Sequence, residues 1–88
     1  MLKKIATEFI GTFIFLSVIL TTGEAFAIGL ALAVAIYFGA GVSGGHFNPA
    51  VSVMMYLKKA INDKELLMYI ISQVLGGIAA LGFFQLKN

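Results

Sequence analysis

Hydrophobic and polar positions divide the chain into long apolar stretches separated by short polar ones. Residues 25–45 and 66–86 contain no charged side chain, and a third apolar stretch near the N-terminus is interrupted only by Glu8. A helix needs about 20 mostly apolar residues to cross the hydrocarbon core of a bilayer. The pattern therefore predicts three transmembrane helices, at about residues 5–21, 25–42 and 65–86.

The segment between the second and third predicted spans, at about residues 43–57, has a different pattern. Gly44 and Gly45 allow the chain to turn sharply, and Asn48 and Pro49 are residue types preferred at the start of a helix. The helix that would follow is about 13 Å long, which is too short to cross a bilayer. Irregular backbone at membrane depth is tolerated only where protein buries it or where it lines a water-filled path. We therefore expect a re-entrant loop followed by a half-helix that begins near the middle of the membrane.

Lysine positions indicate how the chain is oriented. All six basic residues are lysines; only Lys87 follows the third span, and the others lie at positions 3, 4, 58, 59 and 64. Lysine beside a span is enriched on the cytoplasmic side, so we expect a cytoplasmic N-terminus. The basic start and the first apolar run also resemble a signal peptide with a cleavage site near residues 25–27. Glu8 and the apolar chain that follows favour retention of the first span.

Small residues predict where helices approach each other closely. They occur every fourth residue in two rows of the second span, and small faces in lipid let helix backbones come into contact. The first row is Ala27, Ala31, Ala35 and Gly39, and the second is Ala25, Gly29 and Ala33. Two such rows predict that this helix is surrounded more by protein than by lipid.

Composition excludes several classes of protein. Of the 88 residues, 60% are hydrophobic and 11% are charged, and the mean hydropathy is +1.00, which leaves too few polar residues to cover a soluble domain of this size. A dispersed net charge of +2 does not indicate nucleic-acid binding. The chain has no cysteine and one histidine, which is poor material for a metal site. We expect a single all-α membrane domain over residues 1–88, with no catalytic centre, metal or cofactor.

Three short motifs follow one another along the chain: residues 8–13 (EFIGTF), residues 43–50 (SGGHFNPA) and residues 73–77 (QVLGG). In order and spacing they resemble the first-helix motif, the first signature and the third-helix motif of the aquaporin/aquaglyceroporin (major intrinsic protein) family. The resemblance spans almost the whole chain and covers the first half of that family's fold. It implies a channel component for passive transport of water or small uncharged solutes.

The resemblance implies a role at each matched position. Backbone carbonyls of the loop would accept hydrogen bonds from the solute, and Asn48 would donate to it at the pore centre, where its free NH₂ and the half-helix dipole disfavour cations. Glu8 and Gln73 would support the loop. Ile28 falls at the selectivity constriction, where water channels usually carry an aromatic ring or a histidine. The implied pore residues are Gly44, Gly45, His46, Phe47, Asn48 and Ile28, and the half-helix motif is Asn48, Pro49 and Ala50.

The sequence also departs from the family. A complete member has two inverted halves and a selectivity arginine after the second signature, whereas this sequence has one signature and no arginine. We expect the chain not to form the known pore alone, and three explanations stay open. It is a channel half completed by a second, inverted half; it pairs with a second copy in the opposite orientation; or it is a non-conducting or lytic membrane protein that keeps the half-fold.

One observation bears on these alternatives, and another bears on the solute. The lysine asymmetry disfavours the antiparallel pair, because insertion in both orientations needs nearly balanced charge. The stretch from residue 43 to residue 47 looks most like that of water-channel members, so we expect water rather than glycerol. We also expect the channel half to work as part of an oligomer within the lipid bilayer.

Overall fold

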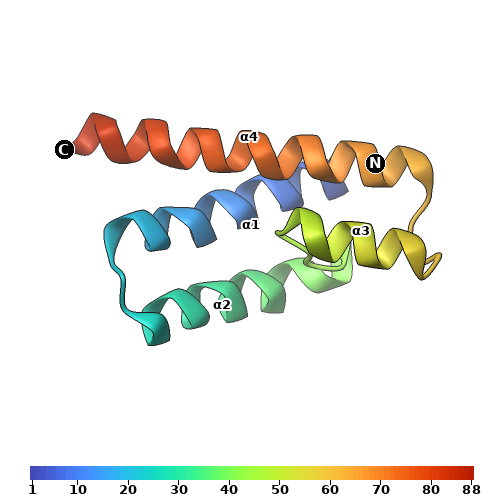
Figure 1. Cartoon of the computed structure of the whole chain (residues 1–88), viewed down its shortest axis with the longest axis horizontal. Helices are drawn as coiled ribbons and strands as arrows, with labels where there is room; N and C mark the ends of the chain where they lie inside the picture. Colours follow the sequence, from blue (N-terminus) through green and yellow to red (C-terminus); the bar gives the residue numbers. More distant parts are fainter.

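The computed structural model describes residues 1–88 and contains four α-helices and no strand (Figure 1). The helices are α1 (Leu2–Thr21), α2 (Ala25–Ser43), α3 (Pro49–Leu57) and α4 (Asp63–Lys87). Three of them, α1, α2 and α4, are long and apolar enough to cross a membrane, whereas α3 has nine residues. The predicted fold class, an all-α membrane protein with three spans and one half-helix, is confirmed.

The three long helices lie roughly along the longest axis of the molecule. α1 packs against both α2 and α4, and α3 packs against α4. Figure 1 shows α1 and α4 running in one direction and α2 and α3 running back. α3 begins near the middle of the molecule and ends where α4 begins. The longest dimension is 40 Å, close to the roughly 40–45 Å thickness of a bilayer with its headgroups.

Side chains at the helix starts satisfy the free backbone N–H groups there. Glu24 precedes α2 and accepts hydrogen bonds from the N–H groups of Phe26 and Ala27, at 3.0 and 2.8 Å. Asn62 precedes α4 and forms a reciprocal capping box with Glu65. Each cap replaces water as a hydrogen-bond partner. These caps fix where the turns between the spans end.

Glycines allow α1 to approach its neighbours closely. A Cβ added to Gly76 would lie 2.8 Å from the carbonyl oxygen of Phe9, so only glycine fits at this crossing of α1 and α4. On α2, Ala35 and Gly39 from the first row of small residues are buried. The second row is exposed, and a Cβ at Gly29 would meet nothing within 4 Å. Within this chain, protein therefore covers one row of α2 and leaves the other open.

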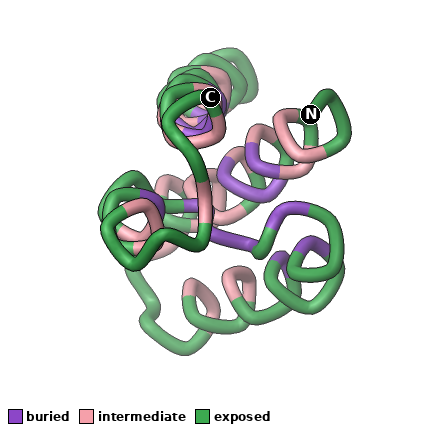
Figure 2. The backbone as a smooth tube through the Cα atoms, turned by 90° about the vertical axis from the view of Figure 1, so that its right-hand side faces the viewer, coloured by how far each residue is buried: buried purple, intermediate pink, exposed green.

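Polar side chains outnumber apolar ones in the buried interior. Fifteen of the 88 residues are buried, and they come from all four helices and from the loop before α3 (Figure 2). Seven of the buried residues are polar or charged, whereas large apolar side chains such as Phe26 and Leu86 are exposed. A protein in lipid reverses the usual arrangement in this way, because the bilayer solvates apolar side chains and excludes polar ones. Polar groups are collected around the re-entrant loop.

Candidate functional site

The half-helix α3 begins at a capping asparagine. Asn48 has an extended backbone, and its Oδ1 accepts a hydrogen bond from the N–H of Ala50 at 2.8 Å. Pro49 occupies the first turn, where its missing N–H costs nothing. The NH₂ of the Asn48 side chain has no partner within the chain, and the residue is exposed. A free donor therefore stands at the positive end of the helix dipole.

The loop before Asn48 uses backbone angles that most residues avoid. Gly44 and Gly45 have φ values of +89° and +63°, and Phe47 has φ 53° although it carries a side chain. The Phe47 ring lies against two glycines of neighbouring helices: a Cβ at Gly11 would overlap it, and a Cβ at Gly39 would come within 2.8 Å. The ring thus fills a space formed by α1 and α2, and this packing holds a left-handed residue in place.

Residues 44–47 leave their backbone carbonyl oxygens without a hydrogen-bond partner inside the chain. Three of these residues, Gly45, His46 and Phe47, are buried. A backbone carbonyl without a partner in the protein accepts a hydrogen bond from water or another donor. Four successive free acceptors next to the Asn48 donor therefore make this stretch of backbone able to bind small hydrogen-bonding molecules.

Glu8 of α1 is fully buried and holds this loop. Its Oε2 accepts hydrogen bonds from the His46 N–H at 3.0 Å and from the Ser43 hydroxyl at 2.7 Å. Its Oε1 accepts from the Phe47 N–H at 2.8 Å and from the Gln73 side-chain NH₂ at 2.9 Å. Four donors compensate the cost of placing a carboxylate in the interior. Glu8 thus connects α1, the loop and α4.

Gln73 of α4 extends the same hydrogen-bond network to the half-helix. Its NH₂ donates to the hydroxyl of Ser52 at 2.9 Å as well as to Glu8. The Ser52 hydroxyl also lies 2.8 Å from Nδ1 of His46. The two residues implied as loop support, Glu8 and Gln73, therefore meet at one point, and the His46 side chain joins the same hydrogen-bond network.

Two residues in this network were not singled out by the motifs. Ser52 is fully buried inside α3, and Tyr69 of α4 donates its hydroxyl to the backbone carbonyl of Ser43 at 2.6 Å. The Tyr69 ring also packs edge-on against His46, with ring centroids 4.9 Å apart. The signal that identifies Tyr69 is its position four residues before Gln73, on the same face of an otherwise apolar helix.

A cavity of about 480 Å³ lies beside the start of α3, between α1 and α4. Asn48, Pro49 and Phe47 border it, together with Thr12 and Gln73. The Thr12 hydroxyl and the Gln73 side-chain carbonyl are buried without a hydrogen-bond partner. The start of the half-helix therefore leaves part of the face formed by α1 and α4 uncovered.

Ile28 lies apart from these residues. It is half-buried near the start of α2, fifteen positions before Ser43, which corresponds to about 22 Å along the helix axis. The chain thus brings Glu8, Gln73, the loop and Asn48 together and leaves Ile28 near the other end of the molecule.

The arrangement of three spans around a capped half-helix agrees with the comparison of this sequence with known proteins. Residues 18–87 match the family described as Major intrinsic protein. The chain belongs to this family. It is 42% identical, over 90% of its length, to Glycerol uptake facilitator protein-like 6 of Lactiplantibacillus plantarum. It is 38% identical to Aquaporin Z of Photorhabdus laumondii and 40% identical to Aquaporin Z of Brucella melitensis, each over 91% of its length.

These alignments also fix how much of a family member the chain represents. They cover 41%, 41% and 42% of the three relatives, so the chain spans about two fifths of their length. Within this length the chain contains one capped half-helix and one Asn-Pro-Ala signature of the major intrinsic protein family.

Proposed function

We propose that the chain forms one half of a pore through which water, or another small uncharged solute, crosses the membrane passively. The observation that carries this proposal is the row of free carbonyl oxygens at residues 44–47 ending at the free NH₂ of Asn48. A row of acceptors replaces the hydrogen bonds that a solute leaves behind in water. The donor and the positive helix end at Asn48 disfavour cations there.

Water is the solute that we favour. The loop at residues 43–47 resembles that of water channels, and this resemblance is the ground for the choice; Ile28 stands where those channels usually carry an aromatic ring or a histidine and does not itself favour water. The relatives include both Aquaporin Z and a glycerol uptake facilitator-like protein. Faster passage of glycerol than of water through the complete assembly would contradict this choice.

The pore half needs a complementary half. Asn48 and Pro49 are exposed at the free start of α3, next to the unfilled cavity between α1 and α4. A second half inserted in the inverted orientation would cover this start and supply the opposite wall of the pore. Such a half could belong to the same polypeptide or to a separate chain, and the completed channel would lie in the bilayer as an oligomer.

The test is osmotic water flux in proteoliposomes. The chain is reconstituted alone, and together with the second half of Aquaporin Z from Photorhabdus laumondii, with co-purification confirming that the halves associate. We expect fast water flux from the pair and little from the chain alone. Flux from the chain alone would favour two antiparallel copies. An associated pair that passes no water would favour a non-conducting membrane protein that keeps the half-fold.

A further inference from the structure

Positive charge is concentrated at one end of the molecule. α1 begins there, α3 ends there and α4 begins there (Figure 1). Five of the six lysines lie at or next to these helix ends, together with two carboxylates, Asp63 and Glu65. The opposite end carries one lysine, Lys87, and one carboxylate, Glu24. The first end has a clear excess of positive charge and the second has none from its side chains.

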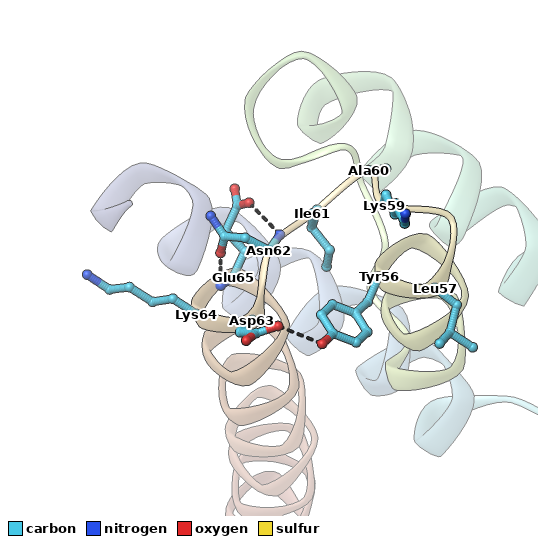
Figure 3. A pocket seen from close by; sticks show the side chains of 9 residues that line it. All are labelled: Tyr56, Leu57, Lys59, Ala60, Ile61, Asn62, Asp63, Lys64 and Glu65. Atoms are coloured by element: carbon cyan, nitrogen blue, oxygen red, sulfur yellow. Dashed lines mark hydrogen bonds between the residues drawn. The ribbon is translucent and has the colours of Figure 1, made fainter.

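Both carboxylates at this end are already engaged within the chain. Glu65 accepts from Lys4 at 2.7 Å, which is the only salt bridge in the structure, and from the Asn62 N–H at 3.1 Å. Asp63 accepts from the Tyr56 hydroxyl at 2.6 Å (Figure 3). That hydrogen bond raises the pKa of Tyr56 above its ordinary value. Four lysines therefore have no carboxylate partner; we call Lys3, Lys58, Lys59 and Lys64 the lysine rim.

Lys59 sits where helices usually place a glycine. The N–H of Lys59 donates to the Tyr56 carbonyl at 2.9 Å, and the N–H of Ala60 donates to the Met55 carbonyl at 2.8 Å. These two bonds form a Schellman motif at the end of α3, in which the left-handed position is commonly glycine. Lys59 holds that position with φ 70°, against the steric preference of a residue with a Cβ. The fold does not need a side chain there, so its presence points to a role for the lysine itself.

The lysines are spread over the surface. Lys59 and Lys64 border an open hollow of about 770 Å³. Figure 3 shows them on opposite sides of it, with the Lys64 side chain extending away. All four lysines of the rim are exposed. Separated charges of this kind suit several anionic groups arranged in a plane better than one small anion held in a pocket.

We propose that the lysine rim binds the phosphate groups of anionic phospholipids in the adjacent leaflet. The 40 Å length of the molecule places its ends at about the depth of the headgroups. Lysines near an anionic membrane surface each contribute to attraction, and this attraction weakens with salt. Leu57, which directly precedes Lys58, is 72% exposed. An apolar side chain next to the lysines suits the boundary between headgroups and acyl chains. This inference rests on membrane insertion and does not depend on whether the chain conducts.

The test measures lipid selectivity of the full chain. The protein is reconstituted in phosphatidylcholine bilayers, and its association with spin-labelled phosphatidylglycerol is compared with that of spin-labelled phosphatidylcholine. We expect a preference for phosphatidylglycerol of about fivefold, which falls towards one when Lys58, Lys59 and Lys64 are all replaced by glutamine. Lys87→Gln, at the opposite end, should keep the preference. Equal association of the two lipids with the native chain, or an equal loss from Lys87→Gln, would overturn the proposal.

Substitutions at Lys59 separate its charge from its backbone. Lys59→Gly should raise the thermal unfolding temperature and lower the preference for phosphatidylglycerol, whereas Lys59→Arg should keep the preference. A purely structural role would instead make Lys59→Gly neutral for lipid association. Inorganic phosphate should compete no better than chloride at equal ionic strength. Specific displacement by phosphate would mean that the rim binds a free anion and would overturn its assignment to lipid.

Discussion

The carboxylate of Glu8 accepts a hydrogen bond from the backbone N–H of Phe47 at 2.8 Å, although the two residues are 39 positions apart. Glu8 comes from the first turns of α1, and Phe47 immediately precedes the half-helix start. Without this acceptor, a buried backbone N–H in a left-handed residue would lose its partner. The conformation of the loop therefore depends on the Glu8 carboxylate of α1.

Glu8→Gln tests this dependence. The replacement keeps the shape of the side chain. It places an NH₂ group against hydrogen-bond donors that contact a carboxylate oxygen in the native protein. An unsatisfied buried donor costs about 1–3 kcal/mol, so we expect a lower free energy of unfolding. Circular dichroism of the protein in detergent micelles measures this change. The control is Glu24→Gln at the exposed start of α2, which should cost less. Equal effects of the two substitutions would count against a special role for Glu8.

Gly11→Ala tests the packing of the Phe47 ring. The added methyl would overlap the ring, and such overpacking costs about 1–3 kcal/mol. Gly29→Ala is the matched control, because its methyl meets nothing within 4 Å and alanine is the better helix former by about 1 kcal/mol. We expect thermal unfolding to show a loss for the first substitution and no loss for the second.

Ser52→Ala tests the link between the half-helix and α4. The change removes a hydroxyl that lies within hydrogen-bond distance of both Gln73 and His46, and we expect a loss of about 1–3 kcal/mol. Ser17→Ala is the control, because the Ser17 hydroxyl is buried without a partner. Its removal should leave the free energy of unfolding unchanged or raise it. Similar losses for both serines would indicate packing rather than hydrogen bonding.

Asn48→Asp tests the role of the capping residue in permeation. Aspartate is also a good N-cap, so the fold should change little, within the roughly 0.5–2 kcal/mol range of cap substitutions. It replaces the free NH₂ with a negative charge at the half-helix start. In an assembly that conducts, we expect the barrier to cations to fall, measured as cation flux in proteoliposomes. If water and cation permeability both stayed the same, Asn48 would have no part in selectivity.

Thiol labelling tests the proposed orientation, and the absence of cysteine makes each introduced thiol unique. Position 60 suits the lysine end, since Ala60 is exposed and makes no side-chain hydrogen bond, whereas Asn62 caps α4. Position 88 suits the other end. We expect an impermeant reagent outside whole cells to label Cys at position 88 and to miss it at position 60. Comparable labelling of both would mean insertion in two orientations and would favour the antiparallel pair of copies.

Local sequence was enough to determine the helices. Each span was visible as an apolar run of membrane length, and α3 was expected from Asn48, Pro49 and the short distance to Lys58. These signals work because helix length, capping and lysine placement act within a few residues of one another. The bounds shifted only at the ends: α1 begins at Leu2 and α4 at Asp63, since polar residues can continue a helix beyond the apolar core.

Tertiary structure decided how the polar groups meet. Gln73 donates to Glu8 across 65 positions and to Ser52 across 21, and Tyr69 reaches the Ser43 carbonyl across 26. No local pattern specifies such pairs, because each depends on which faces α1, the loop and α4 turn toward one another. The resemblance to a family implied support from Glu8 and Gln73, yet Ser52 and Tyr69 became visible only when the helices were packed. The sequence by itself determined the spans, the half-helix and the placement of charge, and packing decided the hydrogen bonds that hold the loop, because in lipid every buried polar group must find its partner inside the protein.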